Sequence, residues 1–244
     1  MTFLKPTTQA PTLSLAFDDT PAQPYFRILL KGYPKGGKTR GALDIASVIA
    51  GDEPFPVINT EKNGVTLYRK MYPRAKVINL SEDTGYNGLT YVEAMKLALT
   101  MNPRVIVIDS ISPAWNGLHG VLDEASESKS DAFYVWKKPK EKNRKLLDLI
   151  QSAPCHVIAT VRSKTKLLVD EKTKEVKKRP GSPIQWNEIE FEFDLNIDYR
   201  DGGIATVTGS RLTRFDVSGD NRPVFNRDNQ TLANLILKSE DDLA

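Results

Sequence analysis

The chain has 244 residues and a formal net charge of +3, with 40% hydrophobic and 27% charged residues. This length allows one sizeable α/β domain, and no apolar stretch reaches the roughly 20 residues that a membrane-spanning helix needs. A single cysteine excludes an internal disulfide and a multi-cysteine zinc site. Together with an N-terminus that lacks a secretory signal pattern, this composition predicts a cytoplasmic protein.

Three segments follow from the local composition. Residues 1–24 are rich in Thr, Pro and Ala, and we expect them to form a flexible arm. A short alternation at residues 13–17 leaves open that the arm adds a strand to a neighbouring subunit. Residues 25–238 form the predicted domain, and residues 239–244 an acidic C-terminal tail.

Within the domain, apolar runs alternate with stretches of helical spacing. The predicted strands are 26–30, 57–59, 75–80, 105–108 and 156–161, and the predicted helices are 39–50, 65–71, 90–100, one ending near 152, and 230–238. This order predicts an α/β fold with a mostly parallel sheet and helices on both faces. Residues 190–199 and 204–208 flank Asp201-Gly202-Gly203, a hairpin signal that predicts antiparallel strands near the C-terminus.

Residues 32–39 read GYPKGGKT and match the phosphate-binding pattern G-x-x-x-x-G-K-[ST]. The glycines let backbone N–H groups surround phosphates, Lys38 neutralises the β- and γ-oxygens, and the Thr39 hydroxyl binds Mg²⁺. A predicted strand before the loop and a helix after it aim the positive end of the helix dipole at the phosphates. The predicted ATP-binding residues are Gly32, Tyr33, Pro34, Lys35, Gly36, Gly37, Lys38, Thr39 and Arg40.

The metal partner of this loop is expected at the end of another apolar strand. Residues 104–110 read RVIVIDS, and Asp109 ends the apolar run. We predict that Asp109 and Thr39 hold magnesium, the alternative for Asp109 being a helix cap. The expected cofactors are therefore ATP and Mg²⁺.

The catalytic carboxylate is not the residue after Asp109, because Ser110 stands there. The candidate is Glu61, which follows the second predicted strand and would polarise the attacking water. The alternative is a surface glutamate at a helix start.

These motifs resemble the RecA recombinase core. RecA-like ATPases carry their glutamate roughly two dozen residues after the P-loop lysine, and Glu61 follows Lys38 by 23 residues. They share VIV-hydrophobic-DS at 105–110 and a sensor strand with a basic turn, here ATVRSK at 159–164. The resemblance implies that Thr160 stands at the γ-phosphate sensor position, where RecA has a longer glutamine.

Within this superfamily the chain is most similar to small phage-encoded RecA-like ATPases, over about residues 25–215. The similarity rests on the P-loop, on the T-E that ends in Glu61, and on the segments 109–115 (DSISPAW), 162–164 (RSK), 183–186 (PIQW), 190–194 (EFEFD) and 208–211 (TGSR). It implies single-strand annealing or recombination together with a single-stranded-DNA-binding protein, in the cytoplasm of a host bacterium.

Two loops are expected to hold single-stranded DNA by analogy with RecA, at residues 112–132 and 163–185. The second is Lys-rich, with an expected hairpin around 170–174, and lysine binds phosphate without reading sequence. A second basic run lies at 137–145, and Trp115 or Trp186 would either stack on bases or belong to the core. The predicted DNA-binding residues are Arg162, Lys164, Lys166, Lys177, Lys178 and Arg179.

The resemblance also implies a head-to-tail ring or filament in which a neighbour completes each ATP site. The candidate for that role is Arg211, with Arg214 in reserve, the alternative being a surface arginine at a strand end. Two rival functions stay open: a RecA-fold motor or helicase accessory that acts through a protein partner, and a nucleotide-dependent switch whose basic segments are merely solvated.

Overall fold

Two layers of helices enclose a nine-stranded sheet in the computed structural model, which describes residues 25–61, 64–127, 133–169, 176–186, 188–218 and 222–241. The sheet order is β3-β2-β4-β5-β1-β7-β8-β9, and β6 pairs with β5 alone. The strands are β1 (Arg27–Gly32), β2 (Phe55–Asn59), β3 (Ala75–Asn79), β4 (Val105–Asp109), β5 (His156–Val169), β6 (Val176–Pro183), β7 (Leu195–Arg200), β8 (Ile204–Ser210) and β9 (Val224–Asn226).

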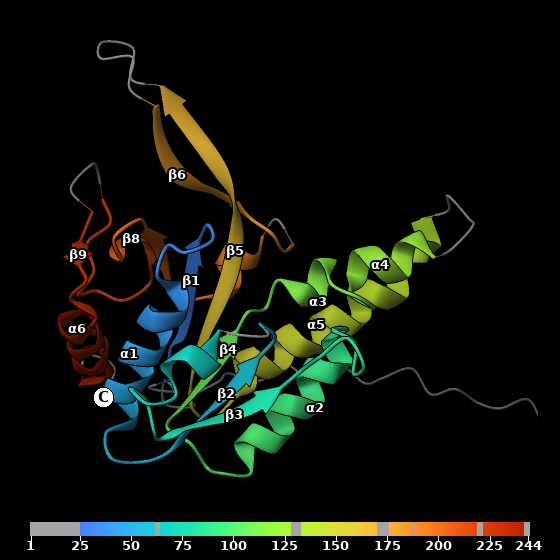
Figure 1. Cartoon of the computed structure of the whole chain (residues 1–244), viewed down its shortest axis with the longest axis horizontal. Coiled ribbons are helices and arrows are strands. Elements are labelled where there is room, and N and C mark those ends of the chain that lie inside the picture. The colour runs from blue at the N-terminus through green and yellow to red at the C-terminus, as the bar shows by residue number, and fades with distance from the viewer. Residues whose placement is uncertain are drawn as a thin grey trace, which may run out of the picture.

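The helices divide between the two faces of the sheet. Helices α1 and α6 lie together on one face, and α2 and α5 pack on the other (Figure 1). The helices are α1 (Lys38–Ala50), α2 (Gly88–Leu99), α3 (Pro113–Asn116), α4 (Val121–Ser126), α5 (Lys137–Ser152) and α6 (Asn229–Asp241), with 3-10 turns η1 (Val65–Tyr68), η2 (Phe133–Trp136) and η3 (Ile189–Glu192).

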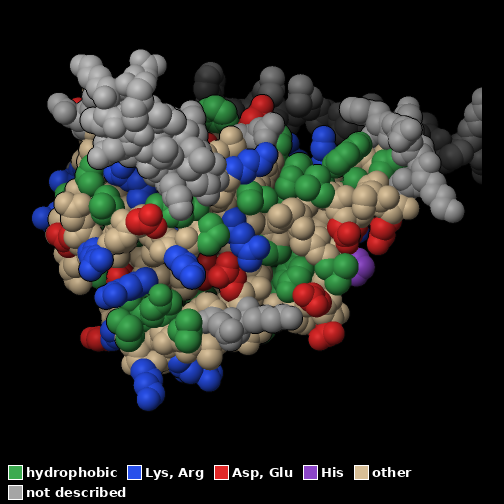
Figure 2. All heavy atoms as spheres, turned by 45° about the horizontal axis from the view of Figure 1, so that its top comes forward, with side chains coloured by type: hydrophobic (Ala, Val, Ile, Leu, Met, Phe, Trp, Pro, Cys, Tyr) green, Lys and Arg blue, Asp and Glu red, His purple; other side chains and the backbone are tan. Residues whose placement is uncertain are grey.

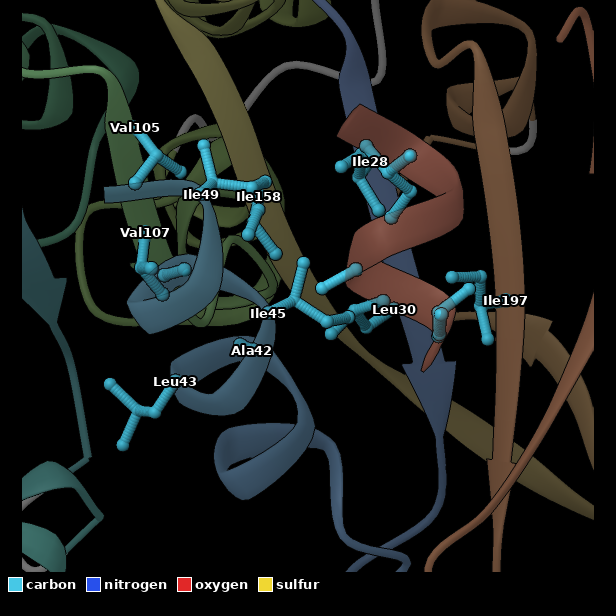
Figure 3. Close-up of a cluster of buried hydrophobic side chains, with 14 of the residues drawn as sticks. Ile28, Leu30, Ala42, Leu43, Ile45, Ile49, Val105, Val107, Ile158 and Ile197 are labelled. Carbon is cyan, nitrogen blue, oxygen red and sulfur yellow. The ribbon is translucent and has the colours of Figure 1, made fainter. Parts of the chain in front are cut away.

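Each central strand contributes side chains to the hydrophobic core on both faces of the sheet. In β1, Ile28 and Leu30 pack toward α1 and α6, while Leu29 between them packs toward α2 and α5. Figure 3 shows the first cluster, in which Ile45 of α1 lies among strand side chains. Continuous apolar runs are therefore buried on both sides, as parallel strands covered by helices require.

The predicted α/β architecture is confirmed, with one difference near the C-terminus. Strands β3, β2, β4, β5 and β1 run parallel, and β8 and β9 are antiparallel additions. Residues 190–199 and 204–208 form the predicted antiparallel hairpin as β7 and β8, but on its other side β7 pairs parallel to β1. The chain returns to the amino edge before β7 begins, where Asp194 N donates to Arg27 O (2.8 Å), so β7 runs in the direction of β1.

Strand β5 extends well beyond the predicted end at Val161. Its second half pairs antiparallel with β6, from Ser163 opposite Pro183 to Val169 opposite Val176. This pairing confirms the predicted hairpin, whose tip at 170–175 lies outside the described residues. The two strands rise from the body of the domain (Figure 1).

The last helix also exceeds its prediction, because α6 continues to Asp241 and takes in the first residues of the expected acidic tail. The predicted arm at residues 1–24 and tail residues 242–244 lie outside the described part of the chain. Across the ranges that the structure covers, no helix combines the length and apolarity that crossing a bilayer would require.

Candidate nucleotide and magnesium site

The predicted phosphate loop connects the carboxyl end of β1 to the first turn of α1. Gly37 is the N-cap of α1 at φ 99°, a left-handed conformation that favours glycine, and it offers no side-chain cap. The first turn of α1 contains no acidic residue. Its backbone N–H groups and the positive end of the helix dipole are thus left for an anion such as phosphate.

The loop rests on β7 and on the turn that follows it. A Cβ at Gly32 would lie 2.5 Å from Tyr199 O, and one at Gly41 would lie 2.3 Å from the Tyr199 hydroxyl. Tyr33 Oη accepts a hydrogen bond from Asp201 N (2.9 Å). The sequence motif contains no sign of this support, because it depends on a strand more than 150 residues away in the chain.

Lys38 lies folded into the loop. Its Nζ donates to the carbonyl oxygen of Tyr33 at 3.0 Å. Burial lowers the pKa of Lys38, while the nearby carboxylates of Asp109 and Glu61 act in the opposite direction. The ammonium therefore stands between the loop backbone and the two acidic residues that the sequence assigned to the same site.

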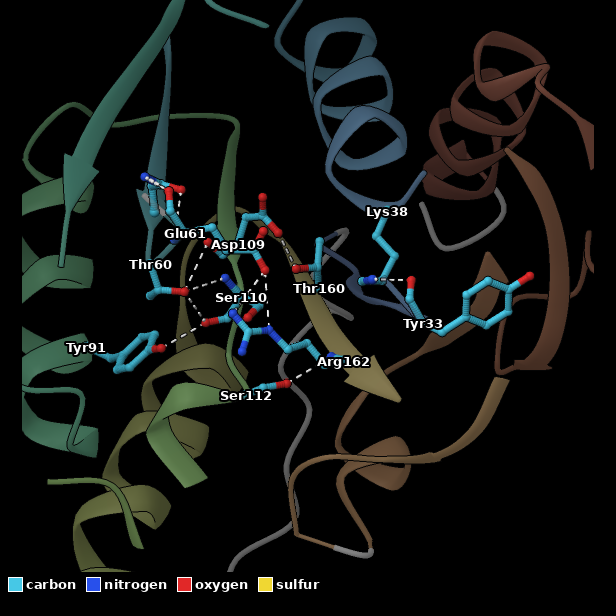
Figure 4. Close-up of polar contacts among 11 residues, drawn as sticks. Tyr33, Lys38, Thr60, Glu61, Tyr91, Asp109, Ser110, Ser112, Thr160 and Arg162 are labelled. Carbon is cyan, nitrogen blue, oxygen red and sulfur yellow. Dashed lines mark hydrogen bonds and ion pairs between the residues drawn. The ribbon is translucent and has the colours of Figure 1, made fainter. Parts of the chain in front are cut away.

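Asp109 ends β4 and is 2% exposed. Its Oδ1 accepts a hydrogen bond from the Thr160 hydroxyl, and its Oδ2 is buried without a hydrogen-bond partner among the described residues (Figure 4). Burial raises the pKa of Asp109 above its ordinary 3.8, the hydrogen bond from Thr160 lowers it, the nearby Glu61 carboxylate raises it further, and the neighbouring Thr39 side chain lowers it. An orphaned carboxylate oxygen beside a threonine hydroxyl fits a hard cation, so Asp109 and Thr39 would hold magnesium.

Asp109→Asn is expected to stabilise the metal-free protein at neutral pH. An acid whose pKa is raised by folding binds more protons in the folded state, so the free energy of unfolding decreases as pH rises from about 4 through the raised pKa. Asparagine keeps the acceptor for Thr160 and removes that penalty. Thermal melts in a chelator from pH 5 to pH 8 measure this, and a variant less stable than wild type throughout contradicts it.

Glu61 and Arg162 face each other across the site. Arg162 Nη2 and Nε lie 3.2 and 3.3 Å from Glu61 Oε1. Asn59 holds the Glu61 backbone from both sides, donating to its carbonyl (3.0 Å) and accepting from its N–H (3.3 Å). The sequence assigned Arg162 to DNA, but its guanidinium lies at the nucleotide pocket, and DNA contact stays a prediction for it.

A hydrogen-bond network joins the ends of β2 and β4. The Thr60 hydroxyl accepts from Ser110 N (3.0 Å), and Thr60 N donates to Asp109 O (2.9 Å). Tyr91 Oη donates to Ser110 O at 2.8 Å, and the Asp109–Ser110 peptide bond is cis. The backbone that carries Asp109 is thereby fixed relative to the backbone that carries Glu61 (Figure 4).

A cavity of about 430 Å³ brings these groups together. It is lined by the P-loop with Lys38 and Thr39, by Glu61 and Arg162, and by Leu67 and Tyr68 of the η1 region. Leu67 is 77% exposed, so the pocket wall carries an apolar and an aromatic side chain in reach of solvent. Neither residue was among those predicted for the site, although their apolar character just after the Glu61 strand was the available signal.

The remaining predicted residues are spread over two other places. Arg211 lies at the amino edge of the sheet, where its guanidinium contacts Asp194 Oδ1 (3.2 Å) and Phe191 O (2.7 Å). Lys164 is exposed on β5 next to the site. Lys166, Lys177, Lys178 and Arg179 belong to the β5–β6 hairpin, and their side chains lie outside the described part.

Comparison with known proteins agrees with this geometry. A family model described as an AAA domain matches residues 25–199. The chain belongs to this family. A KaiC-like protein of the hyperthermophilic archaeon Pyrococcus horikoshii is similar in structure, with 17% identity, a TM-score of 0.49, and coverage of 82% of this chain and 89% of that chain. No curated protein matches the sequence. Membership makes the chain an AAA-type P-loop ATPase domain, a family that binds nucleotide, usually with Mg²⁺.

Proposed function

We propose that this AAA domain hydrolyses ATP, binds single-stranded DNA and promotes strand annealing or recombination. The observation that supports the proposal best is the course of β5. This strand directs Thr160 to Asp109, then Arg162 to Glu61, and continues, past an irregularity in its pairing with β6 between Ser163 and Thr165, into the basic hairpin. Arg162 and the first strand of the hairpin therefore belong to the same strand, so a change in the pairing of Arg162 with Glu61 would shift the backbone that leads into the hairpin.

The residues of the pocket have distinct roles in hydrolysis. The backbone N–H groups of the P-loop and Lys38 would bind the phosphates, and Thr39 and Asp109 would hold the metal. Magnesium, when bound, supplies charge neutralisation at the phosphate oxygens. Glu61 would orient a water and accept its proton, and Thr160 keeps the Asp109 carboxylate in place.

Charge supports a polyanionic partner at the hairpin. Residues 162–179 contain eight basic and three acidic side chains. Figure 2 shows that the coloured Lys and Arg side chains on the face drawn there are interspersed with acidic and apolar ones. Lysine contacts to phosphate would give sequence-independent binding, as annealing requires.

Assembly forms part of the proposal. Head-to-tail packing of subunits, in a ring or filament, would bring Arg211 of one subunit to the ATP site of the next. The Arg211 side chain is 61% exposed and lies at the amino-terminal ends of the strands, whereas the P-loop of the same subunit lies at their carboxyl ends. This position suits a contact with a neighbouring subunit. The resemblance to phage-encoded annealing ATPases supports a single-stranded-DNA-binding protein as a further partner.

Replacing Lys177, Lys178 and Arg179 together with alanine is expected to weaken single-stranded DNA binding and flatten its salt dependence. Each lost phosphate contact lowers the log–log slope by about 0.7, so three contacts lower it by about 2. Fluorescence anisotropy of a labelled oligonucleotide across a salt series, with and without ATP, measures both effects. ATP hydrolysis with and without the oligonucleotide is measured in parallel.

A matched control removes the same charge elsewhere. Lys70, Lys76 and Lys96 are exposed on the β3 and α2 side of the domain, and their triple alanine variant is expected to bind DNA with the wild-type slope. If the log–log salt dependence of DNA binding has the same slope in both triple variants, the hairpin is excluded as the DNA interface. DNA-independent hydrolysis without DNA binding would favour the rival function, an accessory ATPase that acts through a protein partner.

A further inference from the structure

A cavity of about 240 Å³ lies on the side of the sheet away from α1. It is enclosed by α3, by α5 and by the segment that follows β6. The lining residues are Trp115, Lys140, Asn143, Arg144, Leu147 and Trp186. Pockets for drug-sized ligands occupy about 300–1,000 Å³, so this cavity suits a smaller planar group.

Asn143 lies at the wall of this cavity and is 3% exposed. Its Oδ1 atom is buried and has no hydrogen-bond partner within the described part of the chain. Buried amide oxygens are almost always paired, because leaving one unpaired forfeits its hydration without replacement. A ligand N–H group that reached this atom from the cavity would supply the missing partner.

Two indole rings line the same cavity and are half-buried. Trp115 belongs to α3, directly after the Asp109 strand and its turn. Trp186 N donates to Gln185 Oε1 (3.0 Å), and Gln185 Nε2 donates to Ile111 O (3.0 Å), so the segment after β6 is tied to the segment after β4. Aromatic faces that are held in this way suit stacking with a planar ring.

Two cations of α5, Lys140 and Arg144, line the cavity, and Arg144 Nε also lies 3.8 Å from Asp148 Oδ1. Lys140 and Arg144 are exposed on α5, and Lys140 Nζ lies 5.8 Å from the centre of the Trp136 ring. Residues 137–145 contain six basic side chains and one glutamate. A ligand with a planar ring and an attached anion would satisfy the aromatic, amide and basic groups at once.

We propose that this cavity binds one base of single-stranded DNA, with the indoles of Trp115 and Trp186 against the ring. Asn143 Oδ1 accepts a hydrogen bond from the base, and Lys140 and Arg144 contact the adjoining phosphates. The inference rests on the proposed binding of single-stranded DNA, and adds a base contact to the phosphate contacts of the hairpin. The two basic stretches, residues 137–145 and 162–179, then bind the same strand of DNA.

Tryptophan fluorescence tests this directly. The chain has three tryptophans, so Trp136→Phe leaves only the two that line the cavity. Titration with a short deoxycytidine oligonucleotide is expected to quench that fluorescence, because stacking brings a base against the indoles. An abasic oligonucleotide of the same length carries the same phosphates and is expected to leave the fluorescence unchanged.

Two cavity variants test the individual contacts. Trp186→Ala is expected to weaken deoxycytidine binding about tenfold, the usual order for one lost stacking contact. Asn143→Leu keeps the side-chain volume and is expected to weaken it several-fold, with thermal melts confirming that the variants fold. Phe191→Ala removes an aromatic ring that is 74% exposed at the other edge of the sheet and should bind as wild type.

The outcomes separate the two proposals. If the abasic strand binds and quenches as well as the deoxycytidine strand, or if both cavity variants bind as wild type, the base site is overturned while DNA binding through the hairpin stands. If neither oligonucleotide binds, the proposed DNA-binding function fails and the base site with it. Quenching that requires bases and that both cavity variants weaken supports the site.

Discussion

Arg211→Ala is expected to lower steady-state ATP hydrolysis by about a thousandfold, while ATP binding by the isolated subunit stays nearly unchanged. Asp194 N bonds to Arg27 O, and Arg211 N to Asp194 O, which places Arg211 level with the start of β1. The P-loop begins at Gly32, five positions along that strand and roughly 16 Å away. Arg211 is therefore expected to act only on the site of a neighbouring subunit.

A mixing experiment distinguishes action in trans from a structural role. Lys38→Ala subunits keep Arg211, and Arg211→Ala subunits keep an intact P-loop. In a mixed assembly, some interfaces combine the intact P-loop of one subunit with the intact arginine of the other. Hydrolysis should therefore recover above the level of either variant alone.

Arg214→Ala is the matched control for this experiment. Arg214 also follows β8, and its Nε donates to Lys238 O (3.0 Å), so its loss removes a guanidinium from the same region. We expect this variant to hydrolyse ATP at close to the wild-type rate, whereas a thousandfold loss in Arg214→Ala with normal hydrolysis by Arg211→Ala would assign the role in trans to Arg214, the reserve candidate. Mixtures that co-assemble yet show no recovery would mean that Arg211 serves only the fold of its own subunit, through Asp194 and Phe191.

Glu61→Gln is expected to retain ATP binding and to lower hydrolysis about a hundredfold, the usual scale for a positioned base. Glutamine has nearly the same shape and still accepts a hydrogen bond from Arg162, whereas it cannot take a proton from water. Binding of a fluorescent ATP analogue and the rate of phosphate release measure the two effects separately. An equal loss of binding and of turnover would contradict this prediction.

Two further variants test whether ATP hydrolysis depends on the Glu61 carboxylate in particular. Glu82 lines a neighbouring cavity that Glu61 and Arg162 also border, and Glu82→Gln is expected to leave hydrolysis nearly unchanged. Arg162→Gln removes the cation that holds Glu61 Oε1. If Arg162 acts through Glu61, its loss should add little further effect in the Glu61→Gln background, because coupled residues are not additive. Wild-type hydrolysis by Glu61→Gln would leave the base unassigned.

Sequence alone was sufficient for the features that are encoded locally. The motif at 32–39 can be recognised as a phosphate loop from its own glycines, Lys38 and Thr39, and the apolar run before Asp109 as a buried strand from its composition. The order of strands and helices likewise predicted the layered fold, and Asp201-Gly202-Gly203 predicted the antiparallel hairpin of β7 and β8. Each of these depends on neighbours in the chain.

Tertiary structure decided what depends on partners far apart in the sequence. It paired Arg162 with Glu61 across 101 residues, seated the P-loop on Tyr199, and set β7 parallel to β1. Among the described residues it also left Asn143 Oδ1 buried without a hydrogen-bond partner, in a side chain that lines the same cavity as Trp115 and Trp186. A charge or an amide takes its role from the groups that folding brings within a few ångströms, and no local pattern specifies those groups.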